Sequence, residues 1–437
     1  MSKKHFSTAL WLLLTSVVFF ALLSWVPVHS GQRTAYSSET YEADSSRIRF
    51  QHTLDSLKAV QIDDLLNQAY RKGTFNGQVL YAENGQILYR QCFGFSNIRS
   101  RKDSLCNQSA FQLASLSKPF TAVAVMKLYQ NGKIDIYKPV KEYLPDFPFE
   151  EVTVVNLLQH RSGLKNYIYI AEKYWPDKKK ALQNKDISPL LARYGKTLDF
   201  KPGSRFRYCN TNYAYLALLV ETISGQPFAR YFNDSIAQPL GMENTFLYDH
   251  TNPQPEGRKM VTGFSYSRRT GFYKRYPDYL DGVVGDKGLF STAEDIFRFD
   301  QALYDTSFLA DSIRKLMFTP AEPLDSKHDN DYGMGFRIRQ DTGGYQTVFH
   351  NGWWKGFRTY FIHDYLSQRT LIWLNNRSDV TINPYIEKIF DIVGSSYLAE
   401  PSLAKNQPVE ENMEENPEEE REESKMTDEK ETYGSQE

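Results

Sequence analysis

The stretch FQLASLSKPF, residues 111–120, places a Ser-x-x-Lys pair, Ser115 and Lys118, at the start of an apolar segment. Residues three apart share one face of a helix, so a helix that begins here brings the lysine amine beside the serine hydroxyl. A lysine whose pKa is lowered by burial or by a nearby cation can accept the hydroxyl proton. The helix dipole also favours negative charge on a serine at its N-terminus. The stretch therefore predicts a nucleophilic serine with its own base.

Spacing alone does not single out Ser115, because the chain contains three other Ser-x-x-Lys pairs. These are Ser162 with Lys165, Ser312 with Lys315, and Ser402 with Lys405. The first includes a helix-breaking glycine, and the last leads into a polar tail. Ser115 instead precedes a strongly apolar helix, expected over residues 117–129 and ended by Asn131-Gly132. The setting favours Ser115.

The expected strands lie towards the two ends of the folded part of the chain. Residues 78–82 and 86–89 flank Asn84-Gly85, a pair that supplies the positive φ angles of a tight hairpin. Later strands are expected over residues 334–339, 345–350, 357–364 and 370–375, with a turn at residues 341–344. A final amphipathic helix carries four apolar residues on one face, Ile386, Ile389, Phe390 and Val393.

The middle of the chain, residues 135–285, is expected to form helices and loops with few strands. We therefore expect an α/β (α+β) fold, in which one antiparallel sheet is built from both ends of the chain and flanked by helices. An inserted, mainly helical subdomain would cover about residues 135–285, within a single domain over residues 55–400.

Charge is distributed unevenly along the chain. The 52 Lys and Arg nearly balance the 53 Asp and Glu, and the net charge of −1 argues against a basic nucleic-acid-binding protein. Residues 405–437 alone hold 13 acidic and 4 basic residues and almost no apolar ones. We expect an acidic, disordered tail over residues 401–437. The 14% of aromatic residues provide a core for the rest.

The N-terminal residues 1–30 are expected to anchor or export the protein. Lys3 and Lys4 precede an uncharged apolar run at residues 9–26, which as a helix is about 27 Å long, close to the thickness of the bilayer core. Because Val28-His29-Ser30 is a poor cleavage site, an uncleaved membrane anchor is favoured over a cleaved signal peptide. Either would place the protein in the cell envelope, facing the periplasm. Residues 31–54 are expected to be a polar linker, flexible to about residue 46, and a helix then runs to about Arg71.

Other chemistries have little support in the sequence. The three cysteines, Cys92, Cys106 and Cys209, form neither a disulfide framework nor a zinc pattern, although one bridge with one free thiol remains open. There is no His-Glu-x-x-His pair, P-loop or dinucleotide fingerprint, so we expect no metal and no cofactor. The absence of Gly-x-Ser-x-Gly argues against an α/β-hydrolase.

Two further motifs follow the Ser-x-x-Lys pair, Tyr208-Cys209-Asn210 and His350-Asn351-Gly352. In this order the three motifs resemble the signature of the penicillin-recognising serine hydrolases, which include serine β-lactamases, D-alanyl-D-alanine peptidases and related esterases. Segments at residues 157–164, 202–208, 239–242 and 288–292 match the family too. The resemblance covers about residues 55–400 and is strongest to the class C β-lactamase and DD-carboxypeptidase branch, which uses Tyr-x-Asn.

The resemblance implies a role for each motif residue. Ser115 would be acylated, and Lys118 and Tyr208 would form the pair that transfers its proton. Asn210 would hydrogen-bond a substrate amide or Lys118. The backbone N–H groups of Ser115 and Trp353 would form an oxyanion hole. Gly352 would let the substrate approach the strand edge closely.

The third motif departs from the family pattern. His350 stands where many members carry lysine, and histidine is not reliably charged at neutral pH. Asn351 stands where a threonine often helps to bind a substrate carboxylate, and Lys355 or Arg358 are candidates for that contact. These departures argue against an efficient β-lactamase.

The sequence therefore predicts an exported serine hydrolase that acts on a small molecule or a peptide. A D-amino-acid peptidase of the DD-carboxypeptidase type, cleaving a cell-wall peptide, is the preferred activity. An esterase and a weak β-lactamase are the alternatives. An alternative of another class is a membrane-tethered binding or sensor protein without turnover, but the intact Ser115, Lys118 and Tyr208 count against it.

Overall fold

The computed structural model describes residues 38–248, 257–322, 331–340, 346–365 and 367–394. The chain separates into two units at residue 55, and the fold described below belongs to the second unit. Helix α2 (Ser38–Arg71) crosses this boundary. Its C-terminal part belongs to the same unit as the sheet and the site.

A seven-stranded antiparallel sheet is the centre of the fold. Its strands, in spatial order, are β11 (Asp331–Tyr332), β12 (Arg337–Gln340), β13 (Gln346–Trp354), β14 (Phe357–Asp364), β15 (Arg369–Asn375), β1 (Gly77–Glu83) and β2 (Gln86–Phe93). The β1–β15 pair runs from Gly77 opposite Asn375 to Glu83 opposite Arg369 and joins the two ends of the chain. The expected single sheet built from both ends is confirmed.

The β1–β2 hairpin forms where Asn84-Gly85 predicts it. Glu83 lies opposite Gln86, so Asn84 and Gly85 alone form the turn. Asn84 has a φ of 50° and Gly85 a φ of 73°. Positive φ at both positions matches the right-handed twist of the flanking strands, which explains why this pair fixes the hairpin.

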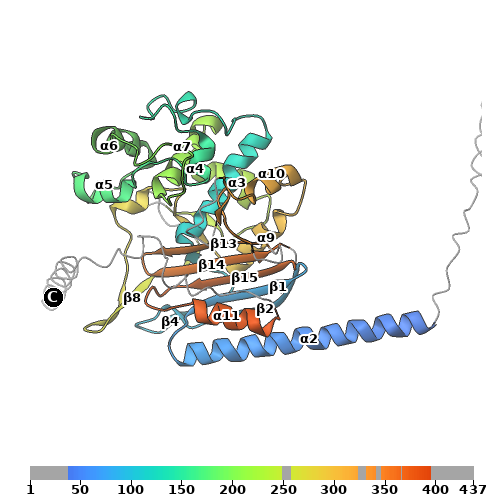
Figure 1. The fold of residues 1–437 in the computed structure, drawn as a ribbon. Coiled ribbons are helices and arrows are strands. Elements are labelled where there is room, and N and C mark those ends of the chain that lie inside the picture. The colour runs from blue at the N-terminus through green and yellow to red at the C-terminus, as the bar shows by residue number, and fades with distance from the viewer. Residues whose placement is uncertain (1–37, 249–256, 323–330, 341–345, 366, 395–437) are drawn as a thin grey trace, which may run out of the picture. The chain divides into compact units, whose positions relative to one another are not determined.

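Both faces of the sheet are buried, and alternate residues pack on opposite sides. Val79, Tyr81 and Trp373 pack with the C-terminal part of α2 and with α11 (Asn383–Ile392). Leu80 and Ile372 belong to the core on the other face, where Figure 1 shows α3 (Ser117–Gln130), α9 (Ala293–Ala302) and α10 (Asp311–Met317). Helix α11 buries all four residues of its predicted apolar face.

The middle of the chain is mainly helical, as expected. It contains α4 (Val154–Leu158), α5 (Tyr167–Tyr174), α6 (Ile187–Tyr194), α7 (Asn210–Ser224) and α8 (Phe228–Phe232). A second sheet of four short strands links this part to the first motif, in the order β6 (Phe246–Leu247), β10 (Leu289–Ser291), β5 (Ser109–Gln112) and β7 (Lys259–Met260). Two further hairpins pair β3 (Phe95–Asn97) with β4 (Lys102–Ser104) and β8 (Phe264–Ser267) with β9 (Gly271–Lys274). Strands of two to four residues are too short for a readable alternation, so the sequence analysis missed them.

Three expected boundaries are wrong. Helix α2 begins at Ser38, within the expected flexible spacer, because no glycine or proline interrupts residues 38–71 and a formed helix extends at little cost. Strand β12 begins at Arg337 rather than residue 334, because Gly335 adopts a φ of 90°. Strand β13 continues to Trp354 and so includes the whole third motif.

The apolar run at residues 9–26, the turn at residues 341–344 and the acidic tail lie outside the described residues. Among the helices that the structure describes, none combines the length and the apolar composition needed to cross a membrane.

Candidate active site

The segment that carries Ser115 is held from two sides. After β5 the chain forms a short 3₁₀ turn, η1 (Ala114–Leu116), and continues directly into α3. The Leu113 N–H donates to the Leu289 carbonyl over 2.8 Å, and the Thr359 hydroxyl donates to the Leu113 carbonyl over 2.8 Å. Ser115 is partly exposed between buried neighbours on either side. Its hydroxyl is therefore fixed in place and still reachable.

Ala114 has a φ of 52°, in the left-handed region that non-glycine residues rarely adopt. Such a backbone costs of order 1–3 kcal/mol and persists only where its surroundings enforce it. Here the contacts of Leu113 and the full burial of Ala114 enforce it. The strained turn directs the chain from strand β5 into helix α3 at the serine.

Gly352 has a structural role that the sequence analysis did not assign. A Cβ atom at this position would lie 2.1 Å from the Leu113 carbonyl oxygen and 3.1 Å from the Ala114 Cβ. The glycine therefore lets strand β13 approach the protein's own nucleophile segment, rather than only a substrate. Trp353, the next residue of β13, is thereby held beside this segment.

The Lys118 amine joins three parts of the chain. Its Nζ lies 3.0 Å from Ser115 Oγ, 2.8 Å from Asn210 Oδ1 and 3.1 Å from the Asp286 carbonyl oxygen. The side chain is fully buried. Of the two partners proposed for Asn210, the structure shows Lys118. An amine 3.0 Å from a hydroxyl can exchange a proton with it directly.

Tyr208 lies on the other side of the lysine. Lys118 Nζ is 4.7 Å from the centroid of its ring, and the half-buried ring packs against His160, with centroids 4.3 Å apart. His160 Nδ1 accepts a hydrogen bond from the Cys209 N–H over 3.2 Å. His160 and the buried Cys209 thus hold the Tyr-x-Asn segment in place.

His350 is neutral in this environment. Burial foremost, and then the charges of Arg337 and Lys118, hold the pKa of His350 well below its usual value. Its Nδ1 lies 2.7 Å from the Asn351 carbonyl oxygen and therefore carries the hydrogen, so Nε2 accepts from the Tyr332 hydroxyl over 3.1 Å. The third motif therefore contributes a fixed, uncharged imidazole.

The cation on this side of the site is Arg337, which the sequence analysis missed. Arg337 lies on β12 opposite Phe349, the residue before His350, and its Cζ is 5.3 Å from the Tyr208 ring centroid. Arg337 reaches the Tyr208 ring only because of the register of β12 against β13, and no sequence motif predicts this position.

The two residues expected to bind a substrate carboxylate are engaged elsewhere. Lys355 forms an ion pair with Asp278, and Arg358 Nε donates to the Ser378 carbonyl over 3.1 Å. Asn351 remains partly exposed on β13. The cation that lies next to the Tyr208 ring from β12 is Arg337.

A second missed feature is a buried charged network behind Lys118. Lys287 Nζ donates to the Tyr167 hydroxyl over 2.6 Å, and that hydroxyl donates to Asp286 Oδ2 over 2.9 Å. Burial, and then the Asp286 charge, raise the pKa of Tyr167 well above its usual value, so the hydroxyl keeps its proton. This network fixes the residue whose backbone carbonyl accepts from Lys118.

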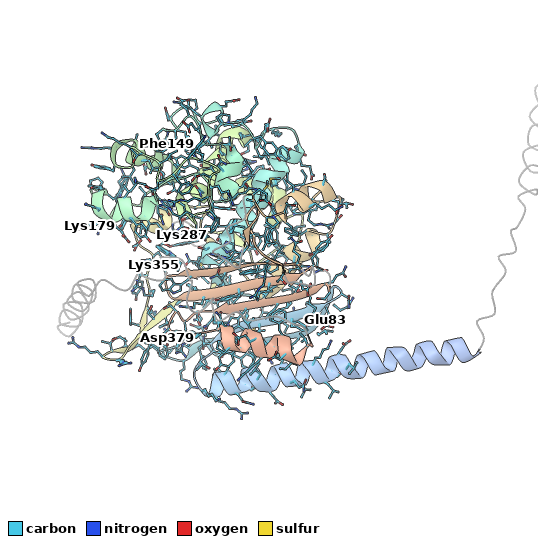
Figure 2. The ribbon with its side chains drawn as sticks, in the orientation of Figure 1. Glu83, Phe149, Lys179, Lys287, Lys355 and Asp379 are labelled. Carbon is cyan, nitrogen blue, oxygen red and sulfur yellow. The ribbon has the colours of Figure 1, made fainter. Side chains whose placement is uncertain are left out.

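The network lies between the helices and the sheet, where Figure 2 shows Lys287 and Lys355 on the same side of the molecule. Both amines approach the ring of Trp354, at 5.2 Å and 5.4 Å from its centroid. The Trp354 indole N–H donates to Asp281 Oδ1 over 2.7 Å. The end of β13 is therefore anchored to the same network that positions Asp286.

Among the described residues, no group of three or more His, Cys, Asp or Glu side chains is arranged to hold a metal ion. The chemistry available at the site is that of the serine, the lysine, the tyrosine and the backbone donors around them.

Fold and site together define the class of protein as a serine hydrolase with a lysine beside its serine. The chain belongs to the Beta-lactamase family, whose model matches residues 62–383. It is similar to penicillin-binding protein 4* of Bacillus subtilis (strain 168), with 34% identity over 332 residues that cover 74% of this chain and 73% of that protein. A D-aminopeptidase of Gluconobacter oxydans (strain 621H) is 23% identical, over 76% of this chain and 61% of its own length.

A solved structure supports the fold. The penicillin-binding protein from Bacillus halodurans superposes with a TM-score of 0.65 at 26% identity, over 75% of this chain and 97% of that one. The β-lactamase/transpeptidase-like fold expected from the sequence is thereby confirmed.

Gly352→Ala tests the contact between β13 and the nucleophile segment. The added Cβ would lie 2.1 Å from the Leu113 carbonyl oxygen and 2.4 Å from Thr359 Oγ1, so we expect the turn that carries Ser115 to move, and a displacement of about 1 Å costs about 100-fold in rate. We expect acylation of Ser115 by a fluorophosphonate to slow by about this factor. Gly132→Ala, where a Cβ meets nothing within 4 Å but a φ of 66° is strained for alanine, controls for a general loss of stability, and equal rates for the two variants would contradict the prediction.

The neutral state of His350 predicts a pH dependence of stability. Its pKa is lowered in the folded protein, so the unfolded chain binds a proton more readily as the pH falls through about 6.5, and stability is lost. Between pH 6.5 and 5.5 this histidine contributes about 1 kcal/mol of that loss. We expect His350→Gln to have a correspondingly smaller decrease in its free energy of unfolding, measured by urea denaturation. Identical decreases would show that His350 is not held neutral.

Proposed function

We propose that this chain hydrolyses an amide or an ester through an acyl-enzyme on Ser115, and that its main activity is that of a D-amino-acid peptidase of the DD-carboxypeptidase type. The observation that carries the proposal is the buried Lys118 amine, 3.0 Å from Ser115 Oγ and held by Asn210. The arrangement equally argues against a binding or sensor protein without turnover.

The geometry of Ser115 and Lys118 supports the following reaction. The Ser115 hydroxyl passes its proton to the Lys118 and Tyr208 pair while Oγ attacks the substrate carbonyl carbon. The oxyanion accepts hydrogen bonds from the backbone N–H groups of Ser115 and Trp353, each worth roughly 3 kcal/mol to the transition state. Tyr208 returns the proton to the leaving group, and water then releases the acyl group by the same proton path.

The charge beside the site supports a peptide with a free carboxylate as substrate. His350 is neutral, so Arg337 provides the positive charge next to Tyr208. A carboxylate on the leaving side of the scissile bond would pair with the planar guanidinium. The relatives named as penicillin-binding proteins and a D-aminopeptidase agree with this chemistry.

An esterase is the second candidate, and a specific observation favours it. The third motif on β13 carries no positive charge, because His350 is neutral. An uncharged ester can therefore bind beside β13 without leaving a buried cation unpaired. Weak β-lactamase activity would use the same acyl-enzyme and Arg337 for the β-lactam carboxylate.

We also propose that the enzyme works in the cell envelope, because two lysines precede the apolar run at residues 9–26. Fractionation of cells that express the full chain, with protease added outside the inner membrane, tests this location. A protein found only in the cytoplasmic fraction would refute it.

The acyl-enzyme is tested by labelling the full chain with a fluorophosphonate and, separately, with a fluorescent penicillin. Mass spectrometry identifies the modified residue, which we expect to be Ser115 with both reagents, and Ser115→Ala should abolish both labels. A folded protein that takes neither label at Ser115 would refute the hydrolase. A fluorophosphonate label alone would favour the esterase.

Tyr208→Phe removes the hydroxyl proposed to transfer the proton and keeps the ring that packs on His160. Loss of general acid–base help slows acylation by about 100-fold or more. The rate of fluorophosphonate or ester turnover measures the effect, and Tyr215→Phe, which alters a buried tyrosine in the core, is the control. An unchanged rate for Tyr208→Phe would assign the proton transfer to Lys118 alone.

Arg337→Gln separates the two candidate activities. A charge-assisted hydrogen bond contributes about 1.5–3 kcal/mol, so the variant should lose about 10- to 100-fold in kcat/KM on a peptide that ends in D-alanyl-D-alanine. Hydrolysis of a neutral ester should be much less affected. If both substrates lose equally, Arg337 supports the catalytic groups and does not select the substrate.

A further inference from the structure

Two of the three cysteines lie together at the base of the β3–β4 hairpin. Phe95 pairs with Ser104, and the Leu105 N–H donates to the Gly94 carbonyl over 3.0 Å. When this antiparallel register is continued, Phe93 falls opposite Cys106 and Cys92 falls opposite Asn107, so the two cysteines occupy neighbouring positions of the register. The side chains agree with this placement, because Cys92 Sγ lies 3.3 Å from Asn107 Oδ1.

Gln78 provides a second, independent link between the two cysteines. It lies on β1 directly opposite Cys92, and directly opposed residues on paired strands project from the same face. Gln78 Nε2 donates to the Cys106 carbonyl over 2.6 Å and to the Ser109 carbonyl over 3.1 Å. The Cys92 side chain therefore points to the segment that holds Cys106.

The third cysteine lies in another part of the molecule. Cys209 is buried in the second motif, and its Sγ is 3.4 Å from the Leu164 carbonyl oxygen. Cys92 and Cys106 are both partly exposed and both carry free thiols. The three cysteines therefore comprise one neighbouring, partly exposed pair and one buried thiol.

The two thiols of the pair have different surroundings. Lys259 Nζ lies 3.5 Å from Cys106 Sγ, and the Ser109 hydroxyl oxygen lies 3.6 Å from it. Desolvation acts against the thiolate, but the hydrogen bonds of Ser109 and of the Gln108 backbone, and the Lys259 charge, outweigh it and lower the pKa of Cys106. Burial, and then the neighbouring Cys106, raise the pKa of Cys92 to about 11.

We propose that Cys92 and Cys106 form a reversible disulfide, with Cys106 as the thiol that reacts first. The Cys106 thiolate attacks one sulfur of a low-molecular-weight disulfide such as oxidised glutathione, which releases one glutathione thiolate and leaves a mixed disulfide on Cys106. The Cys92 thiol loses its proton to solvent and attacks the Cys106 sulfur, releasing the second glutathione. Two protein thiols are oxidised and one external disulfide is reduced, so atoms and electrons balance.

The bond would join the edge strand β2 to the chain just before β5. Strand β5 leads into Leu113 and the turn that carries Ser115. The closed loop contains the whole β3–β4 hairpin, and a covalent closure stabilises mainly by restricting the unfolded chain. The oxidised protein should therefore melt several degrees above the reduced protein.

The test uses the full, reduced chain treated with oxidised glutathione. We expect the intact mass to decrease by two hydrogens, and an unreduced digest to yield one peptide pair that joins Cys92 to Cys106. Cys209→Ser should form the same link, and Cys92→Ser should stop at the mixed disulfide on Cys106. A wild-type protein that keeps glutathione on Cys106, forms no link, or links either cysteine to Cys209 overturns the proposal.

The order of reaction is tested by alkylation of the reduced chain at neutral pH. We expect iodoacetamide to modify Cys106 about tenfold or more faster than Cys92. Lys259→Met should slow modification of Cys106 and leave Cys92 unchanged, which a merely structural lysine would not do. Faster modification of Cys92 overturns the assigned order.

Discussion

A fully buried lysine amine must find its hydrogen-bond acceptors inside the protein, because an unpaired charge there costs several kcal/mol. Lys118 finds them in three segments that are far apart in sequence: the turn of Ser115, the start of α7 at Asn210, and the backbone of Asp286. The helical region and the sheet must therefore close around this one amine. The same requirement that stabilises the fold brings the reactive groups together.

The site also depends on the pairing of the two ends of the chain. Strand β13 is aligned by β14, β15 and β1, and Gly352 and Thr359 then meet Leu113, the residue that begins the nucleophile turn. A shift in this pairing would move the third motif away from Ser115. The buried charged network of Lys287, Tyr167 and Asp286 also supports the site. It fixes Asp286 and, through Trp354, the end of β13.

Local patterns predicted much of this structure, and contacts between strands account for what they missed. Asn84-Gly85 specified its hairpin, the apolar run after Ser115 specified α3, and the order of the three motifs specified the family. Arg337 could not be predicted, because its place beside Tyr208 depends on the register of β12 against β13. The packing role of Gly352 and the buried partners of Asp286 likewise depend on contacts between distant segments, which no periodicity reveals.

The positive charge beside Tyr208 and the third motif lie on different strands, β12 and β13. The uncharged His350 keeps the third motif fixed, and the positive charge resides on a neighbouring strand that makes none of the three contacts of Lys118. A substitution of Arg337 can therefore change the charge beside Tyr208 without removing any of these three contacts of Lys118. This separation makes one arginine a practical starting point for redesign of the charge beside Tyr208.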